Sequence, residues 1–133
     1  MSDDPLIQEI QGYMTEIASA FFREVPKDAA SAKLTTRMVD DYSETDAVMV
    51  DAQGTEKSIS LAESYFDMFD DLRSAMYDTA PNQGAWYMAA LSVTQEGKFR
   101  YEFGYDLKDQ FAHPPSEEEV AADLRRFPRT GTL

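Results

Sequence analysis

The spacing of apolar residues predicts a helix at the start of the chain. From Leu6 to Phe22, apolar side chains recur at intervals of three and four, which is the period of an amphipathic helix. Pro5 suits the first turn of such a helix, where its missing N–H group costs nothing. Because the residue before a proline disfavours helical geometry, we expect the helix to end before Pro26.

After this helix the pattern changes to short runs rich in β-branched residues. The runs KLTTRMVDDY (33–42) and DAVMVDAQ (46–53) are typical of strands, and the polar segment DYSETD (41–46) separates them. The segment TEKSIS (55–60) predicts a third strand. Gly54 lies just before it and can adopt the left-handed backbone geometry that a tight hairpin requires.

A second helical pattern covers residues 62–80. Ser60 and Glu63 form a capping-box pair at its start, and Pro81 marks its end. One face carries rings and long apolar side chains, namely Tyr65, Phe66, Phe69, Leu72 and Met76. Another face is acidic, with Glu63, Asp67, Asp70, Asp71 and Asp78 mostly three to four residues apart.

The stretch WYMAALSVTQEGKFRYEFGYD (86–106) alternates apolar and polar residues on both sides of Gly97. A two-residue turn would set the apolar residues of one strand behind the polar residues of the other. A three-residue loop over 95–97 instead pairs Val93 with Phe99, which makes one face of the hairpin apolar. This register puts most of the rings in the core but turns Trp86 to the opposite face.

The register fixes the other pairs of the same hairpin. It sets Leu91 opposite Tyr101, Ala89 opposite Phe103 and Tyr87 opposite Tyr105. A last helical pattern begins with a second capping box, Ser116 and Glu119, and is expected to stop near Phe127 and Pro128.

The elements therefore follow the order helix, three strands, helix, two strands, helix. Segregated elements of this kind predict an α+β fold. We expect an antiparallel sheet of about five strands packed with an N-terminal helix, a central helix and a short C-terminal helix. The chain has 133 residues and shows no internal repeat or linker, so we predict a single domain over residues 1–133.

Charge restricts the kind of partner. Acids outnumber bases 25 to 12, which gives a formal net charge of −13. The segment from Asp40 to Asp78 holds eleven acids and two bases and so carries −9 of that charge. Such a surface repels nucleic acid, whereas it attracts a basic protein. General solubility is the competing explanation.

Composition also bears on location. The chain has no cysteine, which excludes disulfides and thiolate catalysis. No secretory signal pattern is present at the start, and no run approaches the roughly 20 apolar residues needed to span a bilayer. We therefore expect a cytoplasmic protein without membrane contact; the pattern leaves its oligomeric state open.

Residues suited to catalysis are few. His113 is the only histidine and lies beside two prolines, where a solvated loop is the simpler interpretation. No glycine-rich phosphate loop and no cofactor motif is present. Carboxylates at 40–41, 67–71 and 117–119 could bind a hard cation or act as an acid–base pair. Their solvent-facing positions favour neither role, so we predict no catalytic residue, no metal and no cofactor.

Residues 86–128 resemble the YezG-like immunity proteins, the antitoxins of bacterial polymorphic toxin systems. The matching features are Trp86 at the start of a strand, the turn at 97–99, the pair at 105–106 and the closing helix PPSEEEVAADLRRFPR. The order of the earlier helices also agrees. The tail at 129–133 departs from the family, whose members of this type often continue into a tryptophan-containing segment.

This resemblance implies a small, cytoplasmic, non-catalytic protein that binds and neutralises a cognate toxin domain, often a nuclease. The acidic segment fits capture of a basic toxin by direct contact. The candidate partner-binding residues are Asp67, Asp70, Asp71 and Asp78 for charge, with Tyr77 and Trp86 as aromatic anchors. A small carboxylate-based metal-dependent enzyme and a structural adaptor with an exposed sheet edge are the alternatives.

Overall fold

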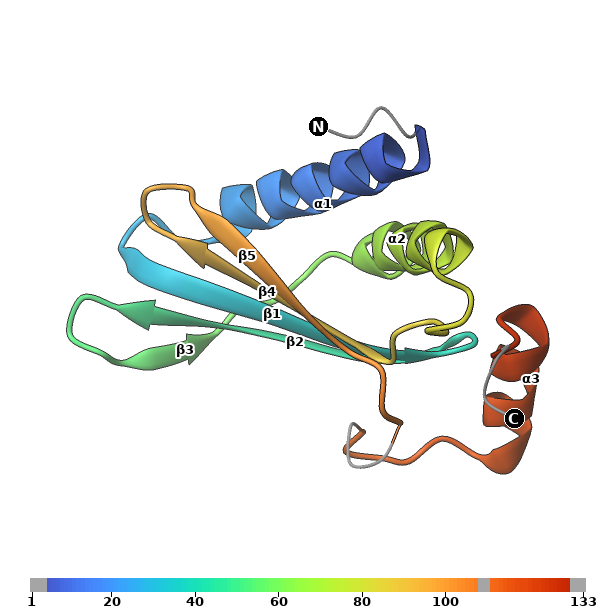
Figure 1. Cartoon of the computed structure of the whole chain (residues 1–133). Helices are drawn as coiled ribbons and strands as arrows, with labels where there is room; N and C mark the ends of the chain where they lie inside the picture. Colours follow the sequence, from blue (N-terminus) through green and yellow to red (C-terminus); the bar gives the residue numbers. More distant parts are fainter. Residues whose placement is uncertain (1–4, 108–110, 130–133) are drawn as a thin grey trace.

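A computed structural model describes residues 5–107 and 111–129 of the chain (Figure 1). Within them lie three helices and five strands. In chain order the elements are α1 (Pro5–Glu24), β1 (Ala29–Val39), β2 (Tyr42–Asp51), β3 (Glu56–Ser58), α2 (Tyr65–Thr79), β4 (Met88–Thr94), β5 (Phe99–Gly104) and α3 (Glu117–Arg126).

The strands form one antiparallel sheet in the order β3-β2-β1-β4-β5. The helices α1 and α2 pack against each other and cover one face of this sheet, whereas α3 lies at the end of the sheet where β1 turns into β2 (Figure 1). The α+β fold and the predicted order of elements are therefore confirmed.

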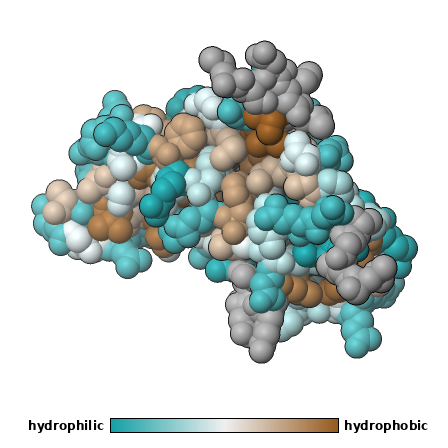
Figure 2. Space-filling model, viewed as in Figure 1, coloured by the Kyte–Doolittle hydropathy of each residue, from teal (hydrophilic) through white to brown (hydrophobic). Residues whose placement is uncertain are grey.

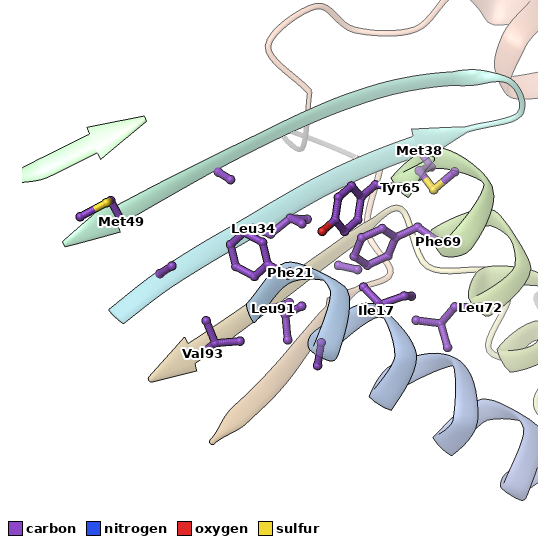
Figure 3. Close-up of a cluster of buried hydrophobic side chains, with 14 of the residues drawn as sticks. Ile17, Phe21, Leu34, Met38, Met49, Tyr65, Phe69, Leu72, Leu91 and Val93 are labelled. Atoms are coloured by element: carbon purple, nitrogen blue, oxygen red, sulfur yellow. The ribbon is translucent and has the colours of Figure 1, made fainter. Parts of the chain in front are cut away.

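The core lies between the sheet and the two covering helices (Figure 3). Ile17 and Phe21 of α1 and Phe69 of α2 point toward Leu34 of β1 and Leu91 of β4, and all five are at most 1% exposed. Burying a side chain of this size stabilises the fold by about 1.5–3 kcal/mol. The helical period of α1 and the alternation of the strands thus meet in one apolar layer.

The β4–β5 hairpin has the predicted register. Val93 pairs with Phe99, Leu91 with Tyr101 and Ala89 with Phe103. Gly97 has a φ of 88°, which is the left-handed geometry that the three-residue loop requires. The glycine in the loop and the alternation of apolar residues both indicated this register, so the sequence alone was enough to predict it.

The prediction that a polar segment separates the first two strands is wrong. The β1–β2 turn contains only Asp40 and Asp41, and β2 already begins at Tyr42. Asp40 has a φ of 52°, a geometry that aspartate tolerates better than most residues. The polar residues beyond the turn are strand residues, and the hydroxyl of Thr45 lies 2.7 Å from that of buried Thr36.

The predicted capping box at the start of the second helix is also wrong. The helix begins at Tyr65 with Ser64 as its N-cap, and no side-chain hydrogen bond caps it. The Ile59 N–H donates to the Ala47 carbonyl at 2.9 Å, which holds the chain beside β2 at this point. Ser60 therefore lies too early to cap α2. The capping box at Ser116, by contrast, is present.

Trp86 does not face away from the other rings. Its side chain is 0% exposed and its ring lies 5.8 Å from that of Phe103 and 6.4 Å from that of Phe69. The ladder of β4 begins only at Met88, so the alternation could not be extended back to Trp86. The predicted orientation is corrected: Trp86 belongs to the core.

Candidate functional site

A buried ion pair joins α2 to α3. The Arg73 guanidinium donates two hydrogen bonds to the Asp123 carboxylate, at 2.5 and 2.9 Å, and both side chains are almost fully buried. Arg73 Nε also donates to the Trp86 carbonyl at 2.6 Å. Asp123 Oδ1 accepts a further bond from the Asp40 N–H at 2.7 Å. One pair thus connects α2, α3, the approach to β4 and the β1–β2 turn.

Aromatic rings enclose this cation. The Arg73 guanidinium carbon lies 5.0 Å from the ring centre of Phe127, 5.6 Å from that of Tyr87 and 5.9 Å from that of Trp86. Burying a charge is costly unless it is paired and hydrogen-bonded. Arg73 and Asp123 meet both conditions, so their arrangement holds the fold together and leaves no open position for a substrate.

A second, half-exposed set of contacts also joins α2 to α3. Arg126 of α3 donates to both carboxylate oxygens of Asp70, each at 2.9 Å. The hydrogen bond to Asp70 raises the pKa of Arg126 further above its usual value. The Tyr77 hydroxyl donates to the Pro128 carbonyl, and its ring lies 5.1 Å from that of Phe127.

We call these residues the α3 junction. Its members are Asp70, Arg73, Tyr77, Asp123, Arg126 and Phe127.

Three of the six predicted partner-binding residues therefore have roles within the fold. Asp70 and Tyr77 belong to the α3 junction, and Trp86 lies in the core, where a partner cannot reach it. The other three predicted residues, Asp67, Asp71 and Asp78, are exposed.

The exposed aspartates form a stripe along α2. Asp67, Asp71 and Asp78 are four and seven residues apart, which sets them on one side of a helix. On α1, Glu9 and Glu16 are also exposed. We call these five carboxylates the acidic face of the helix layer.

Tyr13 lies near carboxylates of both helices of this face. Its hydroxyl donates to Glu9 at 3.1 Å. This hydrogen bond, together with the charges of Glu9, Asp71 and Glu16, raises the pKa of Tyr13. The sequence assigned Tyr13 only to the apolar period of the first helix; the acids three or four residues to either side of it were the signal that could have identified it.

An apolar hollow of about 550 Å³ lies at the end of α1. Phe22, Val25 and Pro26 are among its lining residues, together with the bases Arg23 and Lys27. Phe22 is 41% exposed although the helical period placed it with the apolar residues. Figure 2 shows hydrophobic surface reaching solvent in the upper part of the view, over α1.

A second, more polar hollow of about 630 Å³ lies between the edge of β2 and the start of α2. Its lining residues are Ser43, Thr45, Asp46, Ala47, Ser58, Ile59, Ser60, Leu61, Ala62, Glu63, Tyr65 and Phe66. No pattern in the sequence pointed to it, because it depends on where β3 ends.

Within residues 5–107 and 111–129, no three His, Asp or Glu side chains gather closely enough to hold a metal ion. His113 is exposed, and its backbone N–H donates to Glu44. Across the same ranges, no helix combines the length and the apolar character needed to cross a membrane.

In comparisons with known proteins, no family model and no curated protein matches this chain. The resemblance to YezG-like immunity proteins therefore stays a prediction.

Proposed function

We propose that this chain is a non-catalytic immunity protein that binds a basic toxin domain through the acidic face of the helix layer and so neutralises it. The observation that supports the proposal most is the clustering of exposed carboxylates on α1 and α2. Of the two bases on these helices, Arg73 is buried in the α3 junction and Arg23 lies in the last turn of α1. The face is thus strongly negative.

Such a face suits rapid capture of a cationic protein. Exposed carboxylates in one area create a field that steers a basic partner and raises the rate of association. The resemblance of residues 86–128 to immunity proteins supplies the class of partner, a toxin domain, and the acidic face supplies the expected contact. Tyr13, with its ring among these carboxylates, is the candidate aromatic anchor in place of Trp86.

Coexpression tests the proposal. We expect the chain to restore growth of cells that produce the toxin encoded beside it. The variant Asp67→Asn/Asp71→Asn/Asp78→Asn should protect poorly, because three charges of the acidic face are lost.

A matched control separates the position of the charge from its amount. The variant Glu56→Gln/Glu96→Gln/Glu118→Gln removes the same number of exposed charges elsewhere and should protect fully. If the toxin kills equally with and without the natural chain, the proposed function is wrong. Equal loss in both triple variants would mean that only net charge matters.

A further inference from the structure

The strand β3 covers only part of the edge of β2. It pairs with Val48–Val50, and the Ile59 N–H then bonds to the Ala47 carbonyl. Beyond this point the chain leaves the sheet and rises to α2 (Figure 1). The part of β2 from Tyr42 to Asp46 therefore has β1 on one side, while on the other the described residues provide no strand.

At alternate residues of this uncovered edge, the backbone N–H and C=O groups point away from β1. The Ala47 carbonyl faces the β3 side, since it accepts from Ile59 there. Residues two and four positions earlier in a strand point the same way. The N–H and C=O groups of Ser43 and Thr45 therefore face outward, which offers four hydrogen-bonding groups along an edge of about 17 Å.

The polar hollow lies directly beside this edge. Ser43 and Thr45 of β2 line it, and so do the apolar or aromatic residues Leu61, Tyr65 and Phe66. Its volume of about 630 Å³ leaves room for a segment of extended chain. A strand seated there would turn alternate side chains toward the apolar residues of the hollow and toward the opposite face of the sheet, where Ala112 and His113 contact Glu44.

The charge of the hollow favours one kind of occupant. Asp46 and Glu63 are the charged residues of its lining, and both are exposed acids. Pairing with the same edge of a second copy would bring like charges close together, which is unfavourable. A segment that carries Lys or Arg at alternate positions would instead place cations near both carboxylates.

We propose that the uncovered edge of β2, Tyr42–Asp46, is a docking site for an extended basic segment of a partner protein, which joins the sheet as an added strand. Backbone hydrogen bonds from Ser43 and Thr45 hold the segment, and Asp46 and Glu63 select basic side chains. The inference rests on the proposed function for the identity of the partner as a toxin. Its test needs no toxin.

The first experiment titrates the ¹⁵N-labelled full chain with the peptide Lys-Val-Lys-Val-Lys-Val, blocked at both ends. We expect the amide signals of Ser43 and Thr45 to shift most. The same peptide with proline in place of its central valine keeps the charge but cannot pair fully, so it should bind at least about fivefold more weakly. Equal binding of both peptides, or shifts confined to the acidic face of the helix layer, would overturn the inference.

Variants of the chain test the same site from the other side. Ser43→Pro removes an outward N–H group that the sheet does not use, and should weaken binding of the valine peptide by about fivefold or more. Ser43→Ala keeps that group and should bind like the natural chain. Asp46→Lys/Glu63→Lys leaves the backbone intact and should abolish binding; unchanged affinity would contradict the charge preference. Thermal melts check that each variant is folded.

The outcomes distinguish this inference from the proposed function. If Ser43→Pro still protects cells from the toxin and the peptide fails to bind the natural chain, the edge site is wrong while the immunity function stands. If the peptide binds as expected but the natural chain gives no protection, the edge site stands while the immunity function is wrong. Self-association that Ser43→Pro abolishes would assign the edge to a second copy and would also overturn the inference.

Discussion

Aspartates lie on two sides of α2, but their surroundings differ. Asp70 faces α3 and holds Arg126 through two hydrogen bonds, whereas its neighbour Asp71 lies on the exposed side beside α1. Arg73 completes the first side by pairing with Asp123 in the interior. One side of the helix therefore stabilises the fold, and the other leaves its charge available to a partner.

The two sides differ because an exposed arginine of α3, Arg126, contacts only the side that carries Asp70. Arg126 comes from 56 residues further along the chain, so nothing near Asp70 marks it as paired. On the other side, Asp71 lies near Tyr13 together with Glu9 and Glu16 of α1, and these acids repel Asp71 rather than neutralise it. A surface carboxylate that lacks a cation of its own is a better candidate for binding than one with a bidentate arginine.

The largest expected effect concerns the buried pair. Asp123→Ala would leave the Arg73 charge buried without a partner, which should lower the free energy of unfolding by about 3–5 kcal/mol. Urea unfolding measures this change. The double variant Arg73→Met/Asp123→Leu should recover part of it, because it removes the unpaired buried charge but still takes away the partners of the Asp40 N–H and the Trp86 carbonyl. A loss below about 1 kcal/mol in Asp123→Ala would show that the pair does not hold α3.

A smaller effect is expected at the half-exposed pair. Asp70→Asn removes a charge from a bidentate contact near solvent and should cost up to about 1 kcal/mol. Asp71→Asn, one residue away, is the matched control and should change stability by no more than about 0.5 kcal/mol. Chemical denaturation of both variants gives the comparison. Equal costs would mean that the two sides of α2 do not differ as described.

The smallest expected effect is local and depends on pH. Glu44 accepts bonds from the Tyr42 hydroxyl and from the N–H groups of Ala112 and His113, at 2.6–2.8 Å. Desolvation alone raises the pKa of Glu44, but these three hydrogen bonds outweigh it and lower the pKa overall. The charged carboxylate therefore stabilises the contact fully above the unfolded pKa of about 4.3, and this contribution is lost as the pH falls through the lower folded value.

Amide exchange of Ala112 and His113 reports on this contact. Their protection should fall on acidification through that range in the natural chain. The variant Glu44→Gln has no titratable group at this site, so the protection of both amides should be low and should depend little on pH over this range. Protection that stays constant down to pH 2 in the natural chain would contradict the assigned role of Glu44.

Much of the fold could be predicted from the sequence because several local signals agreed. At the β4–β5 hairpin, the alternation and the position of Gly97 both required the same register. The prediction failed where one signal stood alone. The register was extended to Trp86 beyond the end of the ladder, and Ser60 matched a capping pattern although the chain was still beside β2.

The candidate site was only half predictable. Helical spacing was enough to find Asp67, Asp71 and Asp78 on one side of α2. It could not reveal that Asp70 meets Arg126, because that contact depends on the docking of α3. The uncovered edge of β2 was equally hidden, since it results from the early end of β3.

We propose that exposed carboxylates of α1 and α2 attract a basic partner. The test is the rate of association with the proposed partner, a basic toxin domain, measured by stopped flow at low and high salt. At low salt, Asp67→Asn/Asp71→Asn/Asp78→Asn should associate on the order of tenfold more slowly than Glu56→Gln/Glu96→Gln/Glu118→Gln, and added salt should narrow the gap. Equal rates for the two variants at every salt concentration would mean that the acidic face does not attract the partner.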